Sequence, residues 1–197
     1  MSQPRQYPDA GQAFPIYITV VAGLLFLAFA YLAVGQAAVN RGGAQTAADA
    51  AALAAAQKTR DQLADMWLDA LSDPDKWQAI FEGAVGDNFC PRADELAAQN
   101  KASVLDCQQA TLAYTVEVRT DIPVGDSVVP GTANRKSTAH ARAVIESLCS
   151  FPPPGDDTED DTLPELTCGD QVWDPKPDDP PSRLPKPDDL FDVHLAD

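Results

Sequence analysis

The longest apolar segment of the chain lies near its amino terminus. No Asp, Glu, Lys or Arg occurs in residues 10–40, and the apolar side chains are densest in residues 14–34. A helix over these 21 residues would be about 31 Å long, which matches the hydrocarbon core of a bilayer. Twelve of them are Leu, Ile, Val or Phe, which together favour insertion by roughly 4–7 kcal/mol. The pattern predicts a polar leader over residues 1–13 and a transmembrane helix over residues 14–34.

Two other interpretations of the apolar segment are open. A soluble core helix can be apolar, although it is seldom this long. A cleaved signal peptide is the stronger alternative, because the small-residue triplet Ala28-Phe29-Ala30 resembles a cleavage site. However, the leader has a single basic residue, Arg5, which is offset by Asp9, and the apolar run exceeds the usual signal-peptide core of about 7–15 residues. These features favour an uncleaved anchor.

Alanine dominates the segment after the apolar run, and helical spacing continues to Ser72. Because alanine is the best helix former, residues 35–72 are predicted to extend the membrane helix out of the lipid. Gly42-Gly43 is a point at which this helix could bend or break. The small side chains would permit close approach of a neighbouring helix, or they would simply fill a solvent-exposed helix.

Shorter helices are predicted next. Asp73 and Pro74 are typical of an N-cap and a first helical residue. The apolar residues that follow have helical spacing and predict one buried face: Trp77, Ile80, Phe81 and Ala84. A further short helix is predicted from Pro91 or Arg92 to about Asn100.

A period of two replaces the helical spacing in residues 112–119, which predicts a half-buried strand. Residues 138–146 also alternate, with Ala139, Ala141, Ala143 and Ile145 on one side. The two strands could pair antiparallel, but two strands alone are marginally stable and need helices on one face. Residues 73–150 are therefore predicted to form a small α+β domain with an antiparallel sheet.

Residues 151–197 differ from the rest of the chain in composition. Residues 152–197 contain ten of the 17 prolines, and 14 acidic residues stand there against three basic ones. Such a segment buries too little apolar surface to order itself, so we predict a disordered acidic, proline-rich tail. Cys168 and Trp173 could hold its middle, and the alternation in residues 190–195 predicts a terminal edge strand.

All four cysteines follow the apolar segment: Cys90, Cys107, Cys149 and Cys168. None belongs to a C-x-x-C pair, so no zinc site of the usual spacing is indicated. The even number favours two disulfides and an extracytoplasmic domain, with four free buried thiols in a cytosolic domain as the alternative. Of three possible pairings, the two that close short loops are favoured, at about 3 kcal/mol each. They are Cys90–Cys107 and Cys149–Cys168.

Charge and motifs exclude several functions. The net charge of −16 opposes binding to nucleic acid and to anionic lipid head groups. The two histidines are His140, predicted to be an ordinary strand residue, and His194. No serine-hydrolase, H-E-x-x-H or P-loop motif occurs, and the acidic run at residues 156–161 lacks the spaced ligands of a calcium loop. We therefore predict no catalytic residue, no cofactor site and no metal site.

Two short segments resemble a known family. Residues 11–17 (GQAFPIY) precede the apolar span, and residues 45–54 (QTAADAAALA) follow it. Together they resemble the TadE/TadG-like proteins of Flp (tight adherence) pilus systems. The likeness covers residues 11–57.

The resemblance implies a pilin-like or pilus-assembly protein in the cytoplasmic membrane, with its domain outside the cytoplasm. Its partners would be lipid and other pilin-like or assembly proteins, contacted through the amino-terminal helix. Prepilin-type processing would follow Gly11 and would place Tyr17 sixth in the mature chain. The fifth position is Ile16, where such proteins carry Glu, and Ile cannot neutralise the amino terminus of a neighbouring subunit.

The sequence thus predicts a non-enzymatic, single-pass membrane protein with an α+β fold. Two other functions are compatible with the same residues: a membrane-tethered module that binds an extracellular ligand, and a secreted protein with a cleaved signal peptide.

Overall fold

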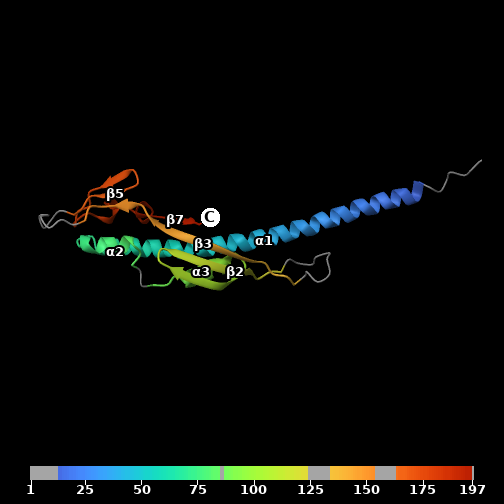
Figure 1. The fold of residues 1–197 in the computed structure, drawn as a ribbon, viewed down its shortest axis with the longest axis horizontal. Helices are drawn as coiled ribbons and strands as arrows, with labels where there is room; N and C mark the ends of the chain where they lie inside the picture. The colour runs from blue at the N-terminus through green and yellow to red at the C-terminus, as the bar shows by residue number, and fades with distance from the viewer. Residues whose placement is uncertain (1–12, 85–86, 124–133, 154–162, 197) are drawn as a thin grey trace, which may run out of the picture.

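One helix dominates the structure. The computed structural model describes residues 13–84, 87–123, 134–153 and 163–196. Its first element, α1 (Ala13–Asp69), has 57 residues and is therefore about 86 Å long (Figure 1). The predicted membrane helix and alanine-rich helix are thus continuous. Gly42 and Gly43 lie within α1 without a break, because a cost of about 1 kcal/mol per glycine is small beside the hydrogen bonding of the turns on either side.

Three short helical elements follow α1 in the region where two short helices were predicted. They are η1 (Pro74–Lys76), α2 (Trp77–Phe81) and α3 (Cys90–Gln99). Trp77, Ile80 and Phe81 are buried as predicted, whereas the prediction is wrong for Ala84, which is exposed beyond the end of the helix. Asp73 occupies the N-cap position of η1, but its carboxylate contacts the Lys76 ammonium at 2.8 Å instead of capping a backbone N–H. This hydrogen bond raises the pKa of Lys76 above its ordinary value.

The main sheet has four antiparallel strands in the order β1-β2-β3-β7. The predicted pairing of two strands is confirmed by β2 and β3, and the predicted terminal edge strand is confirmed by β7. The first strand was not predicted, because a bulge between Val104 and Asp106 disturbs its alternation. The strands are β1 (Ala102–Ala110), β2 (Ala113–Thr120), β3 (Thr138–Ser147) and β7 (Phe191–Leu195).

The carboxyl-terminal half of α1 packs across one face of this sheet (Figure 1). Ala47, Ala51 and Ala55 are completely buried, and Val116 and Val118 of β2 belong to the same core. The small side chains let the helix backbone approach the strands closely. The interpretation as an exposed helix is therefore wrong for the buried alanines of residues 44–56. A helix does approach this segment closely, but it belongs to the same chain, because α3 packs on α1. The alanines form the core of the domain itself.

The tail is ordered where the structure describes it, so the prediction of disorder is wrong for residues 163–196. This part contributes two of the three strands of the small sheet and buries Leu166, Leu184, Leu190 and Phe191 in the core. A few apolar residues are enough to order this part of the chain, because they pack into the core that α1 forms with the main sheet. Residues 154–162, which contain the acidic run, lie outside the described residues. The elements are β4 (Cys149–Ser150), β5 (Leu166–Cys168), β6 (Gln171–Trp173), η2 (Pro181–Arg183) and α4 (Pro187–Leu190).

An aromatic cluster closes the far end of this core. The ring centroids of Trp67 and Trp77 are 5.5 Å apart, and Phe151 lies 5.5 Å from the ring of Trp77. Phe81 continues the cluster to Phe191, at 5.2 Å. The cluster therefore ties α1, α2 and β7 together. We call α1 from Ala44 onward, with all the elements that follow it, the head.

Both favoured disulfides are present. Cys90–Cys107 joins α3 to β1, with Cα atoms 5.9 Å apart, and Cys149–Cys168 joins β4 to β5, with Cα atoms 4.0 Å apart. All four cysteines of the chain are therefore paired.

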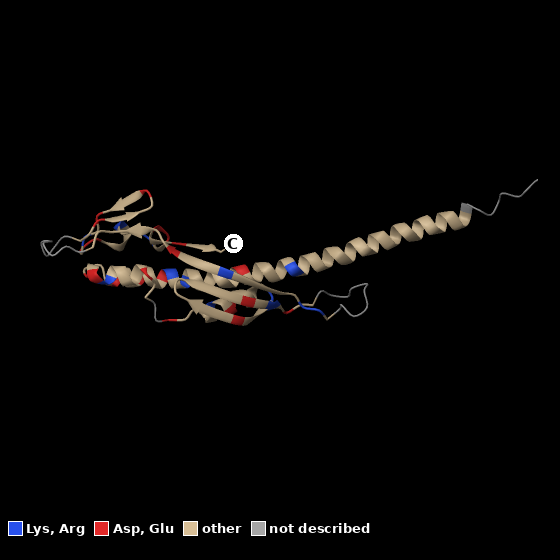
Figure 2. Ribbon diagram, in the orientation of Figure 1, with Lys and Arg blue, Asp and Glu red and all other residues tan. Residues whose placement is uncertain are grey.

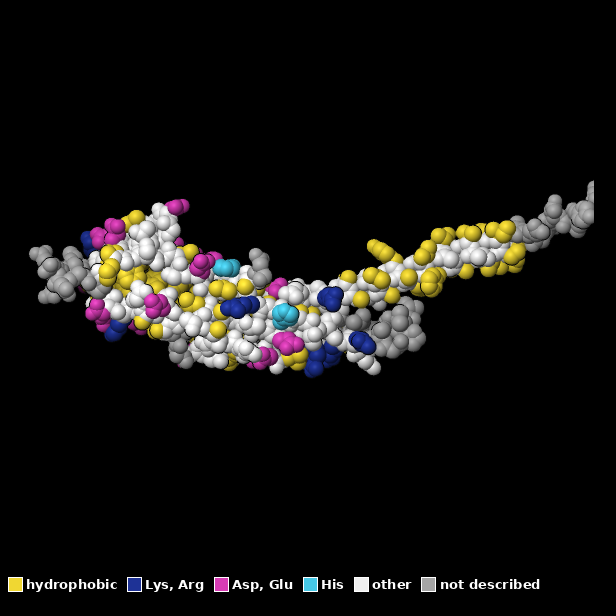
Figure 3. Space-filling model, in the orientation of Figure 1, with side chains coloured by type: hydrophobic (Ala, Val, Ile, Leu, Met, Phe, Trp, Pro, Cys, Tyr) yellow, Lys and Arg dark blue, Asp and Glu magenta, His cyan; other side chains and the backbone are white. Residues whose placement is uncertain are grey.

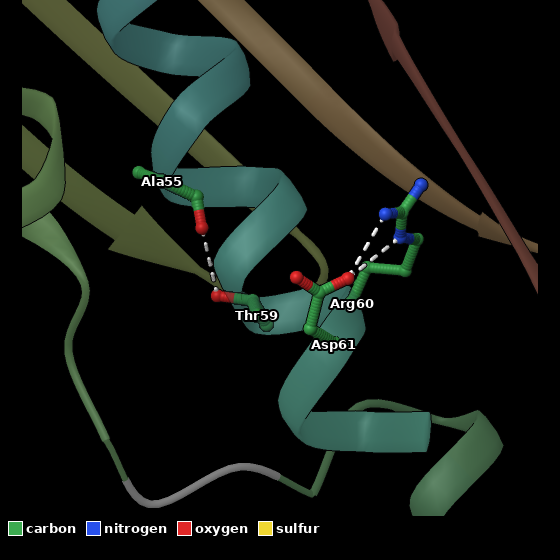
Figure 4. A network of polar contacts seen from close by, with 4 residues as sticks. All are labelled: Ala55, Thr59, Arg60 and Asp61. Carbon is green, nitrogen blue, oxygen red and sulfur yellow. Dashed lines mark hydrogen bonds and ion pairs between the residues drawn. The ribbon is translucent and has the colours of Figure 1, made fainter. Parts of the chain in front are cut away.

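A buried polar contact also fixes α1 to the sheet. The hydroxyl oxygen of Thr59 lies 2.9 Å from the hydroxyl oxygen of Tyr114 on β2. Thr59 also bonds the carbonyl oxygen of Ala55, whereas the neighbouring Arg60 pairs with Asp61 at 2.9 Å (Figure 4). The buried hydroxyls satisfy each other, so they do not weaken the core.

The alanine packing yields a first prediction. Replacing Ala51→Leu inserts a larger side chain between α1 and the sheet, so the free energy of unfolding of the head should fall by about 1–3 kcal/mol. Urea unfolding followed by tryptophan fluorescence measures this, because Trp67 and Trp77 are fully buried in the head. The matched control is Ala98→Leu on the exposed side of α3, which should change the stability little. Equal effects of the two substitutions would contradict this account of the core.

Candidate functional site: the exposed apolar helix

The amino-terminal half of α1 extends beyond the other elements that the structure describes. We call residues 14–43 the exposed segment. Nearly all of its large apolar side chains are about half exposed or more, from Ile18 at 49% to Tyr31 at 84%. Figure 3 shows apolar side chains along the visible face of the helix that extends from the head. Soluble monomers rarely present an apolar surface of this extent, so the exposed segment needs a non-aqueous environment.

The exposed segment has the length and composition of a membrane span. An 18-residue window within it has a mean hydropathy of 2.3, and none of that window is buried by the rest of the chain. A soluble core helix would be buried, so that interpretation does not fit. Thr19 donates its hydroxyl hydrogen bond to the carbonyl oxygen of Pro15 at 2.7 Å, which satisfies this polar group inside the helix. The candidate site is therefore a helix that is long and apolar enough to cross a bilayer.

The head begins abruptly. Asn40 donates a hydrogen bond to the carbonyl oxygen of Ile122 after β2, at 3.4 Å, and Ala44 is already fully buried. Ala44 lies ten residues beyond Val34, which is about 15 Å along the helix. Because α1 is continuous here, no hinge separates the exposed segment from the head.

The alanine-rich motif has a structural explanation at this boundary. Gln45 donates to the carboxylate of Asp49 at 2.8 Å, one helical turn away, and to the carbonyl oxygen of His140 on β3 at 3.4 Å. Most of the alanines between and after these residues are buried in the core, where α1 packs on the sheet and on α3. The polar residues of the motif therefore hold the register of α1 on β3, and the alanines allow the contact.

The predicted site residues do not meet in one place. Tyr17 is exposed near the start of the exposed segment, whereas the four cysteines lie in the head. Gly11 lies outside the described residues. Processing after Gly11 therefore stays a prediction.

Both histidines lie on the surface of the main sheet. His140 is exposed on β3, and His194 on β7 contacts the Asp192 carboxylate at 2.8 Å. Within the described residues, no three His, Cys, Asp or Glu side chains are grouped closely enough to hold a metal ion.

Sequence reasoning missed a groove between α1 and α3. It has a volume of about 840 Å³, and Leu53 and Phe89 contribute apolar lining. Arg92 and Glu95 also line it and form an ion pair with each other on α3. No local sequence pattern could have revealed this groove, because it exists only where two helices distant in sequence diverge.

The comparisons with known proteins concern the exposed segment and its continuation. Residues 11–58 match the family model described as "Putative Flp pilus-assembly TadE/G-like". The resemblance predicted from the sequence is thus confirmed over this TadE/G-like segment, which includes both the exposed segment and the alanine-rich part of α1 inside the head. No curated protein and no solved structure matches the chain.

The exposed segment yields a second prediction. Replacing Leu25→Arg places a charge at the centre of the span, at a cost of roughly 3 kcal/mol to insertion. A larger fraction of the protein should then be released from membranes by carbonate extraction. Val39→Arg is the matched control, because Val39 lies beyond the predicted span and its variant should stay in the pellet. Complete retention of the Leu25→Arg variant would argue against a span centred here.

Proposed function

We propose that the protein is a non-catalytic, single-pass component of pilus assembly in the cytoplasmic membrane. One observation carries the proposal: the TadE/G-like segment is a single helix whose first half exposes apolar side chains and whose second half is the core of a folded head. Such a helix couples a membrane anchor directly to a soluble domain.

The head is proposed to lie outside the cytoplasm. Cys90–Cys107 and Cys149–Cys168 support this side, because disulfides persist in oxidising compartments. The positive-inside rule gives no clear orientation, since Arg5 precedes the span while Arg41 and Lys58 follow it.

Assembly is proposed to proceed by lateral contact between helices in the membrane. Most alanines of residues 44–56 are buried by the sheet and by α3, so a partner helix would use the exposed segment. Around Gly23 and Gly35 the chain itself leaves open space, and glycines permit close helix approach in lipid. Ile16 offers no carboxylate for a neighbouring amino terminus, so contacts of the apolar surface would supply the association.

The proposed orientation gives a third prediction. Whole cells are denatured without a reductant and then treated with a polymer-linked maleimide. The mass of the protein should stay unchanged, because all four cysteines are oxidised and offer no free thiol. Reduction before labelling should add four polymer chains. The control is Cys90→Ser, which frees Cys107 and should add one polymer chain without reduction. Four reactive thiols in the unreduced wild-type protein would place the head in the cytosol.

The proposed role in assembly gives a fourth prediction. Deleting the gene should abolish pili, or stop export if the assembly machine serves secretion, and the wild-type gene should restore the phenotype. The Val39→Arg variant should restore it as well, whereas Leu25→Arg should fail because its anchor is weakened. Electron microscopy of piliated cells and assay of exported protein measure these outcomes. Normal pili and normal export in the deletion strain would refute the role.

A further inference from the structure

The fold gathers basic residues at one end of an acidic protein. Five exposed residues surround the place where the exposed segment enters the head, and we call them the basic collar. They come from α1, from the residue that precedes β1, from the end of β2 and from the segment before β3. They are Arg41, Lys101, Arg119, Arg135 and Lys136. Figure 2 shows basic residues at this end of the head, and acidic residues more often elsewhere on it.

Strand register explains why residues so distant in sequence meet. Ala102 at the start of β1 pairs with Thr120 at the end of β2, and Arg119 pairs with Thr138 at the start of β3. The hydrogen bond from Asn40 to Ile122 fixes this edge of the sheet beside α1. The strand ends that carry the collar therefore face the membrane side of the head.

Few acidic groups oppose the collar. Asp121 lies at the same end and accepts a hydrogen bond from Ser103 at 2.5 Å, while Glu117 lies two residues further into β2. None of the five basic side chains forms an ion pair with another residue that the structure describes. The connection 124–133 lies outside the described residues and contains one acid, Asp126. The local charge is thus positive although the whole chain carries −16.

The collar lies close to the layer of lipid head groups. Arg41 is seven residues beyond Val34, which is about 10 Å from the predicted edge of the hydrocarbon core. The polar layer of a bilayer extends roughly 5–8 Å beyond that edge, and charges interact over a Debye length of about 8–10 Å. The collar is therefore within electrostatic reach of the head groups, whereas the acidic far end of the head is not.

We propose that the basic collar binds the phosphates of anionic phospholipids and holds the end of the head on the bilayer surface. The inference rests on the proposed membrane anchoring and adds a lipid preference to it. It reverses the expectation from net charge, under which the acidic chain would avoid anionic lipid.

The test uses the full-length protein in phosphatidylcholine bilayers that contain a trace of spin-labelled lipid. Electron spin resonance measures the relative association of phosphatidylglycerol and phosphatidylcholine with the protein. The preference for phosphatidylglycerol should be about twofold or more at about 50 mM salt and should fall to about one at about 0.5 M, because salt screens the contact. Phosphate and chloride salts at equal ionic strength should act equally, whereas a stronger effect of inorganic phosphate would reveal a free-phosphate site and overturn the proposal.

Matched variants locate the contact on the head. Neutralising the four collar residues of the head should abolish the preference, whereas neutralising four exposed basic residues elsewhere on the head should preserve it. Conservative Lys→Arg and Arg→Lys exchanges at the collar should also preserve it, and tryptophan fluorescence verifies that each variant is folded. The collar set is Lys101→Gln, Arg119→Gln, Arg135→Gln and Lys136→Gln. The control set is Lys76→Gln, Arg92→Gln, Lys176→Gln and Arg183→Gln.

Three outcomes would overturn the proposal. The first is a wild-type protein that is inserted, by carbonate extraction, but shows no preference for phosphatidylglycerol. The second is that Arg41→Gln alone abolishes the preference while the four-residue collar variant keeps it. The lipid would then bind at the helix beside Arg41 and not at the strand ends of the head. The third is self-association of the protein that weakens with salt, without any lipid preference. This result would mean that the collar binds an acidic surface of another protein copy instead of lipid. A protein released by carbonate would instead refute the membrane anchor on which both proposals depend.

Discussion

The structure depends on the close packing of an alanine-rich helix against an antiparallel sheet. Ala47, Ala51 and Ala55 have no exposed surface, and β2 and β3 lie directly over them. Larger side chains at these positions would hold the helix away from the sheet and open the core. The same helix continues into a segment whose apolar side chains are mostly exposed in the described part of the chain. One secondary structure element thereby combines a surface suited to a protein core with a surface suited to a lipid bilayer, and the change between them is at Ala44.

The continuity of α1 has a mechanical consequence. No loop separates the exposed segment from the head, so the tilt and rotation of the helix in a bilayer would set the position of the head. The aromatic cluster around Trp67 and Trp77 and the Cys149–Cys168 disulfide stabilise the end of the head that lies furthest from the exposed segment. The basic collar would act at the near end. The two ends of the head therefore differ in their interactions: apolar packing and a covalent bond at one, charge at the other.

The net charge of the chain does not describe the charge at each end of the head. A net charge of −16 predicts repulsion from anionic lipid, and it describes the chain as a whole. Electrostatic interactions in salt solution act over about one Debye length, so the charge that a surface meets is local. Lys101, Arg119 and Lys136 are separated by many residues, and only the register of three strands brings them to one end of the head.

The sequence by itself determined the elements that local patterns encode. Apolar length predicted the exposed segment, alternation predicted β2, β3 and β7, and the short loops favoured the two disulfide pairings. The tertiary structure alone decided what each surface contacts. It showed that the alanines are core, that β1 forms an edge despite its bulge, that residues 163–196 are ordered and that α1 and α3 leave a groove. The physical reason is that periodicity fixes which side chains share a face, whereas burial depends on partners from distant parts of the chain, which no local pattern contains.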